Sequence, residues 1–143
     1  MERDRIGRLA LALLFFSALS IGLTATASPR TFYDDFPFLT HWVELLPPFN
    51  EHLVTDVGGL YLGFAVLFGW AAWKFERPLV RPLCVAWLLT AGLHLIFHAG
   101  HLEGFGTADA VAEIASLTLL LVPAAVALWA CRAEGPPPTG ERP

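Results

Sequence analysis

The run LCVAWLLTAGLHLIFHAG, residues 83–100, decides the fold of this chain. It contains no Asp, Glu, Lys or Arg, and its only imidazoles are those of His94 and His98. The hydrocarbon core of a bilayer is about 30 Å thick, and a helix needs about 20 predominantly apolar residues to cross it. The run is therefore predicted to be a transmembrane helix.

Three other stretches of the chain have a comparable length and apolar content. The connections between all four stretches are short, so consecutive helices are expected to pack as antiparallel neighbours. In chain order the predicted spans are residues 6–27, with Arg8 near the start, residues 53–73, interrupted by Asp56, residues 83–100, and residues 110–131, with Glu113 near the start.

The composition of the whole chain agrees with a membrane protein. Hydrophobic residues make up 55% and charged residues 15%, with a mean hydropathy of +0.56, whereas a soluble domain carries about 25% charged residues. Nine basic and 13 acidic residues give a net charge of −4, which argues against a nucleic-acid partner. We predict an all-α fold: an integral membrane four-helix bundle over residues 1–132, embedded in the lipid bilayer, and a disordered Pro-rich tail at 133–143.

Lys and Arg residues concentrate on one side of the predicted bundle. Only Arg30 lies in a connection on the opposite side. Because short cytoplasmic loops are enriched in Lys and Arg, both termini are predicted to be cytoplasmic, in a multi-pass protein of the cell membrane. The eight residues that share the cytoplasmic side are Arg3, Arg5, Arg8, Lys74, Arg77, Arg81, Arg132 and Arg142.

The first stretch also has the features of a cleavable signal peptide. Residues 1–8 are charged, residues 9–23 are apolar, and Ala25-Thr26-Ala27 forms an A-x-A-like site before Ser28. Cleavage there would leave three spans and would not change the sidedness of the later loops. The stretch is long enough to cross the membrane, so we expect it to be retained as a helix.

Ionisable side chains inside the spans gather toward the outer side. His94, His98 and His101 follow the spacing i, i+4, i+7, so they share one face of the third helix. The second and fourth helices each present a pair four residues apart: His52 with Asp56, and Asp109 with Glu113. At about 1.5 Å of rise per residue, two layers are expected to converge: an outer layer of His52, His98 and Asp109, and a deeper layer of Asp56, His94 and Glu113.

A metal site is the first of three interpretations of this cluster. Two imidazoles four residues apart on a helix, together with a carboxylate, suit a transition metal such as Zn, Fe or Cu. Haem, held by His52 and by His94 or His98, is a variant. The H-E-x-x-H and E-x-x-H motifs are absent. The candidate ligands are His52, Asp56, His94, His98 and Glu113, with Asp109 as a further candidate.

The second interpretation is a proton or quinone site, because buried carboxylate–imidazole pairs relay protons. The third is structural: Asp56 and Glu113 would hydrogen-bond His94 and His98 and so fix the order of the helices. The best functional hypothesis is a metal- or haem-binding, redox-associated site. The alternative is a non-catalytic accessory or assembly subunit of a larger membrane complex, and the sequence leaves enzymatic activity undecided.

Small residues and cysteines add two further expectations. The Gly59-x-x-x-Gly63 pair permits close approach of helix backbones, and we expect it to serve packing within the bundle, with a homo-oligomer seam as the alternative. Cys84 and Cys131 lie at the cytoplasmic ends of their spans and do not form a C-x-x-C motif. A disulfide relay at the outer site is therefore not expected. Pro123 is expected to kink the fourth span.

The layout of these elements resembles a group of small four-helix bacterial membrane proteins. The features that carry the resemblance are Asn50-Glu51-His52 at the start of the second helix, Asp56-Val57-Gly58-Gly59 within it, and the His-rich outer end of the third helix. Over residues 6–131 the chain is similar to DoxX-like families. The resemblance implies a four-helix membrane bundle with redox-associated roles and assigns no catalytic residue. The chain has no cysteine on the predicted outer side, so thiol chemistry is not expected there.

Overall fold

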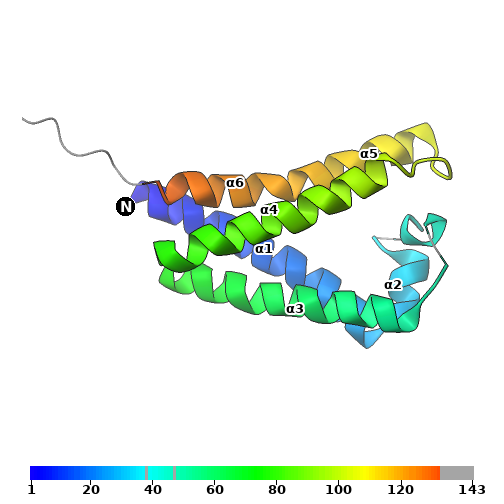
Figure 1. The fold of residues 1–143 in the computed structure, drawn as a ribbon, viewed down its shortest axis with the longest axis horizontal. Helices are drawn as coiled ribbons and strands as arrows, with labels where there is room; N and C mark the ends of the chain where they lie inside the picture. The colour runs from blue at the N-terminus through cyan, green and yellow to red at the C-terminus, as the bar shows by residue number, and fades with distance from the viewer. Residues whose placement is uncertain (38, 47, 133–143) are drawn as a thin grey trace, which may run out of the picture.

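The protein is described by a computed structural model that covers residues 1–37, 39–46 and 48–132. It is all-α, and the four predicted apolar helices are confirmed, each long and apolar enough to cross a membrane. The predicted tail lies outside the described residues. The membrane-length helices, drawn in Figure 1, are α1 (Glu2–Ala27), α3 (Glu51–Lys74), α4 (Arg77–Ala99) and the segment formed by α5 (Thr107–Leu119) and α6 (Leu121–Ala130).

Local chemistry defines where α3 begins and ends. The Asn50 side chain accepts a hydrogen bond of 3.1 Å from the Leu53 backbone N–H, which satisfies a donor that the first turn leaves free. At the other end Phe75 adopts a left-handed conformation, with φ 50° and ψ 51°, that stops the helix. Two short elements, α2 (Pro29–Asp35) and the 3-10 turn η1 (Val43–Leu45), lie between α1 and α3.

The fourth span, expected as one kinked helix over residues 110–131, is interrupted at a single residue that keeps right-handed helical dihedrals. It divides into α5 and α6 at Leu120. Pro123 has no backbone N–H and cannot donate to the carbonyl four residues earlier, so the regular helix is interrupted there. The Trp87 indole N–H donates to the Leu120 carbonyl at 3.0 Å, which supplies a partner at the break.

The order of helix packing differs from the expected chain of neighbours. The central helix is α1, which packs against both α3 and α6, while α4 packs against α6. Although α3 and α4 are consecutive, their backbones are close only near their short connection and then diverge (Figure 1). The expectation that all consecutive helices pack side by side is therefore wrong for α3 and α4.

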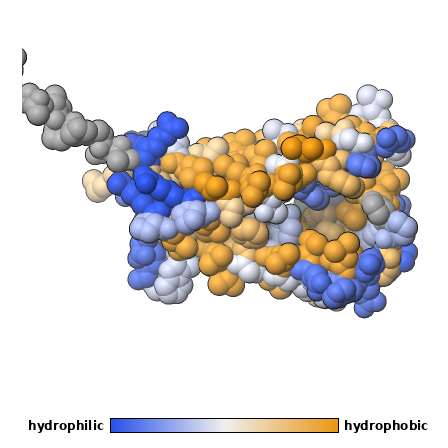
Figure 2. Space-filling view, viewed as in Figure 1, coloured by the Kyte–Doolittle hydropathy of each residue, from blue (hydrophilic) through white to orange (hydrophobic). Residues whose placement is uncertain are grey.

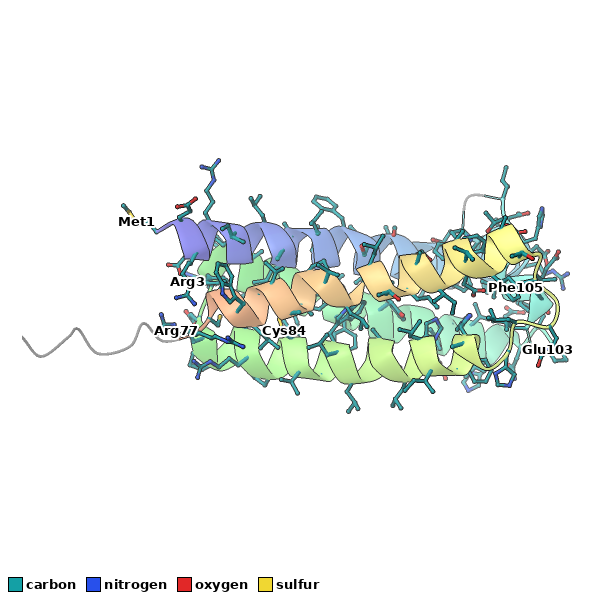
Figure 3. The ribbon with its side chains drawn as sticks, turned by 90° about the horizontal axis from the view of Figure 1, so that it is seen from above. Met1, Arg3, Arg77, Cys84, Glu103 and Phe105 are labelled. Atoms are coloured by element: carbon teal, nitrogen blue, oxygen red, sulfur yellow. The ribbon has the colours of Figure 1, made fainter. Side chains whose placement is uncertain are left out.

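Arginines bind the helix ends together at one end of the bundle, which we call the basic end. The Arg3 guanidinium donates to the Trp129 carbonyl at 2.7 Å, and Arg81 donates to the Cys131 carbonyl at 2.9 Å. Arg8 donates to the carbonyls of Ala72, at 2.7 Å, and Trp73 at the end of α3. These cations cap carbonyls that the helix ends leave unpaired. Figure 3 labels Arg3 and Arg77 at this end and Glu103 and Phe105 at the opposite, acidic end.

The half of the bundle nearer the basic end is closely packed. Trp87 is 1% exposed and makes edge-on contacts with three rings of α3, those of Tyr61, Phe64 and Phe68. Around it lie fully buried side chains of α1, α4 and α6. The indole therefore fills the space between α3 and α4, whose backbones do not meet there.

The half nearer the acidic end is open. From the middle of the bundle onward, α4 and α5 diverge from α1 and α3 (Figure 1), and the surface between the two pairs is hollowed (Figure 2). The segment around η1 crosses this opening, because the Trp42 indole N–H donates to the Asp109 carboxylate at 3.3 Å. The open half is thus a recess whose mouth is bridged by the loop between α1 and α3.

Candidate functional site

Two polar side chains are buried where α4 meets α5. His98, near the end of α4, is 6% exposed, and Glu113, two turns into α5, is 3% exposed. They are the only buried polar or charged residues among those described. The Nδ1 atom of His98 is in ion-pair contact with the Oε1 atom of Glu113, so α4 and α5 are joined by an imidazole–carboxylate pair.

The connection between the helices determines this pairing. A turn over residues 100–106 reverses the chain, and α5 then runs back along α4. His98 is one residue before the end of α4 and Glu113 is six residues after the start of α5. The sequence predicted both residues as site candidates, and the structure brings these two together.

The pair is close but incompletely satisfied. His98 Nδ1 is occupied by its contact with Glu113 Oε1. The other carboxylate oxygen, Glu113 Oε2, has no hydrogen-bond partner among the described residues. Buried polar atoms without partners are rare and costly. This carboxylate oxygen is therefore available to a proton, another cation or a polar ligand atom.

His94 lies one helical turn away from this pair. Its ring is edge-on to the ring of His98, with 4.4 Å between centroids, and its side chain is exposed. His101, which was expected on the same face, instead stacks on Phe97 at 4.1 Å and contacts the Phe97 carbonyl at 2.7 Å. The predicted histidine face therefore separates into His94 with His98 on one side and His101 on the other.

His52 and Asp56 form a separate pair on α3. His52 Nε2 lies 3.3 Å from Asp56 Oδ2, and the two side chains are 86% and 60% exposed. Gly58 lies against Ala25 and Thr26 of α1, which leaves His52 and Asp56 on the uncovered side of α3. The expected convergence of three helices into two polar layers is therefore wrong, because α3 presents its pair outward.

Asp109 has a structural partner that the sequence analysis missed. Its carboxylate accepts the Trp42 indole hydrogen bond, which ties the loop before α3 to the start of α5. The sequence offered no direct signal for this contact, because 67 residues separate Trp42 from Asp109. Among the described residues, no group of three or more His, Cys, Asp or Glu side chains is placed to hold a metal ion.

The cysteines lie away from this site. Cys84 and Cys131 are both buried free thiols in the core of the packed half. Their place agrees with the expectation that they cannot meet the polar cluster near the acidic end. Among the described residues, the His98–Glu113 pair and its neighbour His94 are therefore the candidate site.

The architecture defines an all-α chain with four membrane-length apolar helices and a buried imidazole–carboxylate pair near its acidic end. No protein family, curated protein or solved structure matches the chain. The resemblance to DoxX-like families stays a prediction, and the functional argument depends on the site itself.

Proposed function

We propose that the protein is a multi-pass protein of the cell membrane with its basic end in the cytoplasm. The support is the arrangement of charge: among the described residues, every Lys and Arg except Arg30 belongs to one end of the bundle, which the start of α1 and the end of α6 share. On the other side, Arg30 is paired with Asp34 at 2.7 Å, and this hydrogen bond raises the pKa of Arg30.

Reporter fusions test this orientation. A reporter placed after Pro143 is expected to be cytoplasmic, and one inserted at Phe105, between α4 and α5, is expected to be external. A C-terminal reporter on the external side would overturn the proposed orientation.

We further propose that His94, His98 and Glu113 form a proton-binding relay in the outer half of the membrane. The observation that carries this function is the buried pair, in which the Glu113 Oε2 atom has no hydrogen-bond partner among the described residues. A pair holding one proton is neutral overall, either as two neutral groups or as an ion pair, so it avoids the cost of an isolated charge in a medium of low dielectric constant. His94 is exposed beside His98, so it provides the path by which a proton reaches the buried groups.

Infrared difference spectroscopy tests the relay. The purified protein in lipid is titrated between about pH 4 and 9, the range in which carboxyl and imidazole groups exchange protons. We expect a carbonyl-stretch band of a buried carboxyl group that changes with pH and is lost in Glu113→Gln. The matched control is Glu103→Gln, in the exposed turn, which should retain the band. A band that does not respond to pH in a well-folded protein would overturn the relay and leave the pair as a structural link in an accessory subunit.

The metal or haem site predicted from the sequence is the alternative to the relay, although no three His, Cys, Asp or Glu side chains among the described residues are placed around one ion. Two of its predicted ligands, His94 and His98, are in ring contact four residues apart on α4. Elemental analysis and a visible spectrum of protein purified without chelator distinguish the two. A stoichiometric transition metal or a haem band that is lost in His94→Ala and retained in His41→Ala would replace the proton relay.

A further inference from the structure

One face of α3 packs against the rest of the bundle. A Cβ atom added at Gly58 would meet Ala25 and Thr26 of α1 at 2.8–3.0 Å, and one added at Gly69 would meet Phe15 at 3.2 Å. A quarter-turn around the helix, aromatic side chains of α3 contact Trp87 of α4. Together these contacts cover little more than half of the circumference of α3.

The opposite face of α3 is uncovered along its whole length. Its residues follow alternating steps of four and three, which places them in one stripe, and every one of them is exposed. A Cβ atom added at Gly59 or Gly63 would meet nothing within 4 Å. The expectation that these two glycines serve packing within the bundle is therefore wrong. The stripe consists of His52, Asp56, Gly59, Gly63, Val66 and Trp70.

The ionisable residues His52 and Asp56 make lipid an unfavourable environment for this face of α3. Asp56 is five residues beyond the start of α3, about 7 Å along the helix axis. Ionisable residues within spans are expensive in lipid and almost always face protein or a water-filled cavity. Glu113 obeys that rule, because it is buried at 3% exposure. The Asp56 side chain is 60% exposed in the single chain, and it would obey the rule if another protein surface covered the stripe.

We propose that the stripe is the contact surface for a second copy of this chain, with α3 packed against α3 around a two-fold axis normal to the membrane. In such an interface each residue contact occurs twice, with the roles exchanged. His52 would then face the partner's Asp56, and Asp56 the partner's His52, so one cationic or donor group meets one acceptor on both sides of the axis. The same axis places Gly59 and Gly63 against their own counterparts, where the absence of side chains permits close backbone approach.

Disulfide cross-linking in native membranes tests the symmetric contact. Gly59→Cys and the control Gly92→Cys, on α4, are each made in a chain that also carries Cys84→Ala and Cys131→Ala. The control is matched because a Cβ at Gly92 also meets nothing within 4 Å. We expect oxidation to give a covalent dimer of the Gly59→Cys chain and much less of the Gly92→Cys chain. Equal cross-linking at both positions, no dimer at either, or a conjugate with a different protein would overturn the proposal.

The mass of the purified protein in lipid nanodiscs provides a second test. Asp56→Ala removes two symmetric contacts per dimer, and Gly63→Ile fills open space in the single chain but blocks close approach of two copies. Each is expected to raise the dimer dissociation constant about tenfold, while the thermal unfolding of the single chain is unchanged. Asp34→Ala, in α2, is the control and should leave the dimer intact. A monomeric wild-type protein would overturn the proposal and would leave the proton relay unaffected.

Discussion

The two halves of the bundle use the same kind of helix in different ways. Near the basic end, arginines hold the helix ends and Trp87 fills the space between α3 and α4. Near the acidic end the helix pairs diverge, and the only buried polar residues among those described, His98 and Glu113, belong to one pair. The comparison teaches that apolar length alone makes a helix long enough to cross a membrane, while close packing is confined to the half with complementary side chains.

The largest effect is expected from the loss of α1, which packs against both α3 and α6. Removal of residues 1–27 would expose the apolar faces of both neighbours, so the chain starting at Ser28 should not form a monodisperse protein in detergent. Size-exclusion chromatography checks this outcome. N-terminal sequencing of the full-length product should accordingly not begin at Ser28, and a well-folded protein that begins there would establish the signal peptide instead.

The closely packed half should be sensitive to the loss of its central ring. Trp87→Ala removes contacts with three rings and the indole hydrogen bond to the Leu120 carbonyl. The expected loss of stability is about 3–5 kcal/mol, measured by unfolding in detergent. Trp73→Ala is the control, because that ring is 65% exposed and lies outside the proposed contact stripe, and similar losses for the two variants would contradict a core role for Trp87.

The open half should respond most strongly at Glu113. Glu113→Ala leaves His98 buried without its carboxylate, which is expected to cost about 1–3 kcal/mol, between the values typical of transmembrane polar pairs and of buried ion pairs. Asp56→Ala, by contrast, should leave the unfolding of the single chain unchanged, because its pair is exposed. A larger loss for Asp56→Ala than for Glu113→Ala would show that the α3 pair faces the interior.

The smallest expected effect distinguishes two adjacent glycines. Gly58→Ala forces a methyl group against the α1 backbone at the Thr26 nitrogen, 3.0 Å away, and should destabilise the protein by about 1–2 kcal/mol. Gly59→Ala meets open space and should stabilise α3 slightly, by less than about 1 kcal/mol. Thermal unfolding of the two variants, compared in monomeric protein, checks the sign of the difference. Equal shifts would mean that α1 and α3 are not in close contact there.

Apolar length and residue pattern were sufficient to predict the four membrane-length helices and the candidate residues His98 and Glu113. These features are local, because the length of an apolar run and the face on which a side chain lies depend on the helix itself. The break at Leu120 was predicted only as a kink, since a proline removes one hydrogen bond but does not decide how the neighbouring helices respond.

Only the tertiary structure decided which helix faces meet. Gly58 rather than Gly59 approaches α1, and the pair on α3 faces outward while Glu113 reaches His98. These outcomes depend on the rotation of each helix about its axis and on the divergence of α3 from α4, which follow from side-chain packing between segments far apart in the chain. The periodicity of a sequence predicts the face of the helix on which a residue lies. Which other helix that face contacts depends on packing, such as the insertion of the Trp87 side chain between α3 and α4.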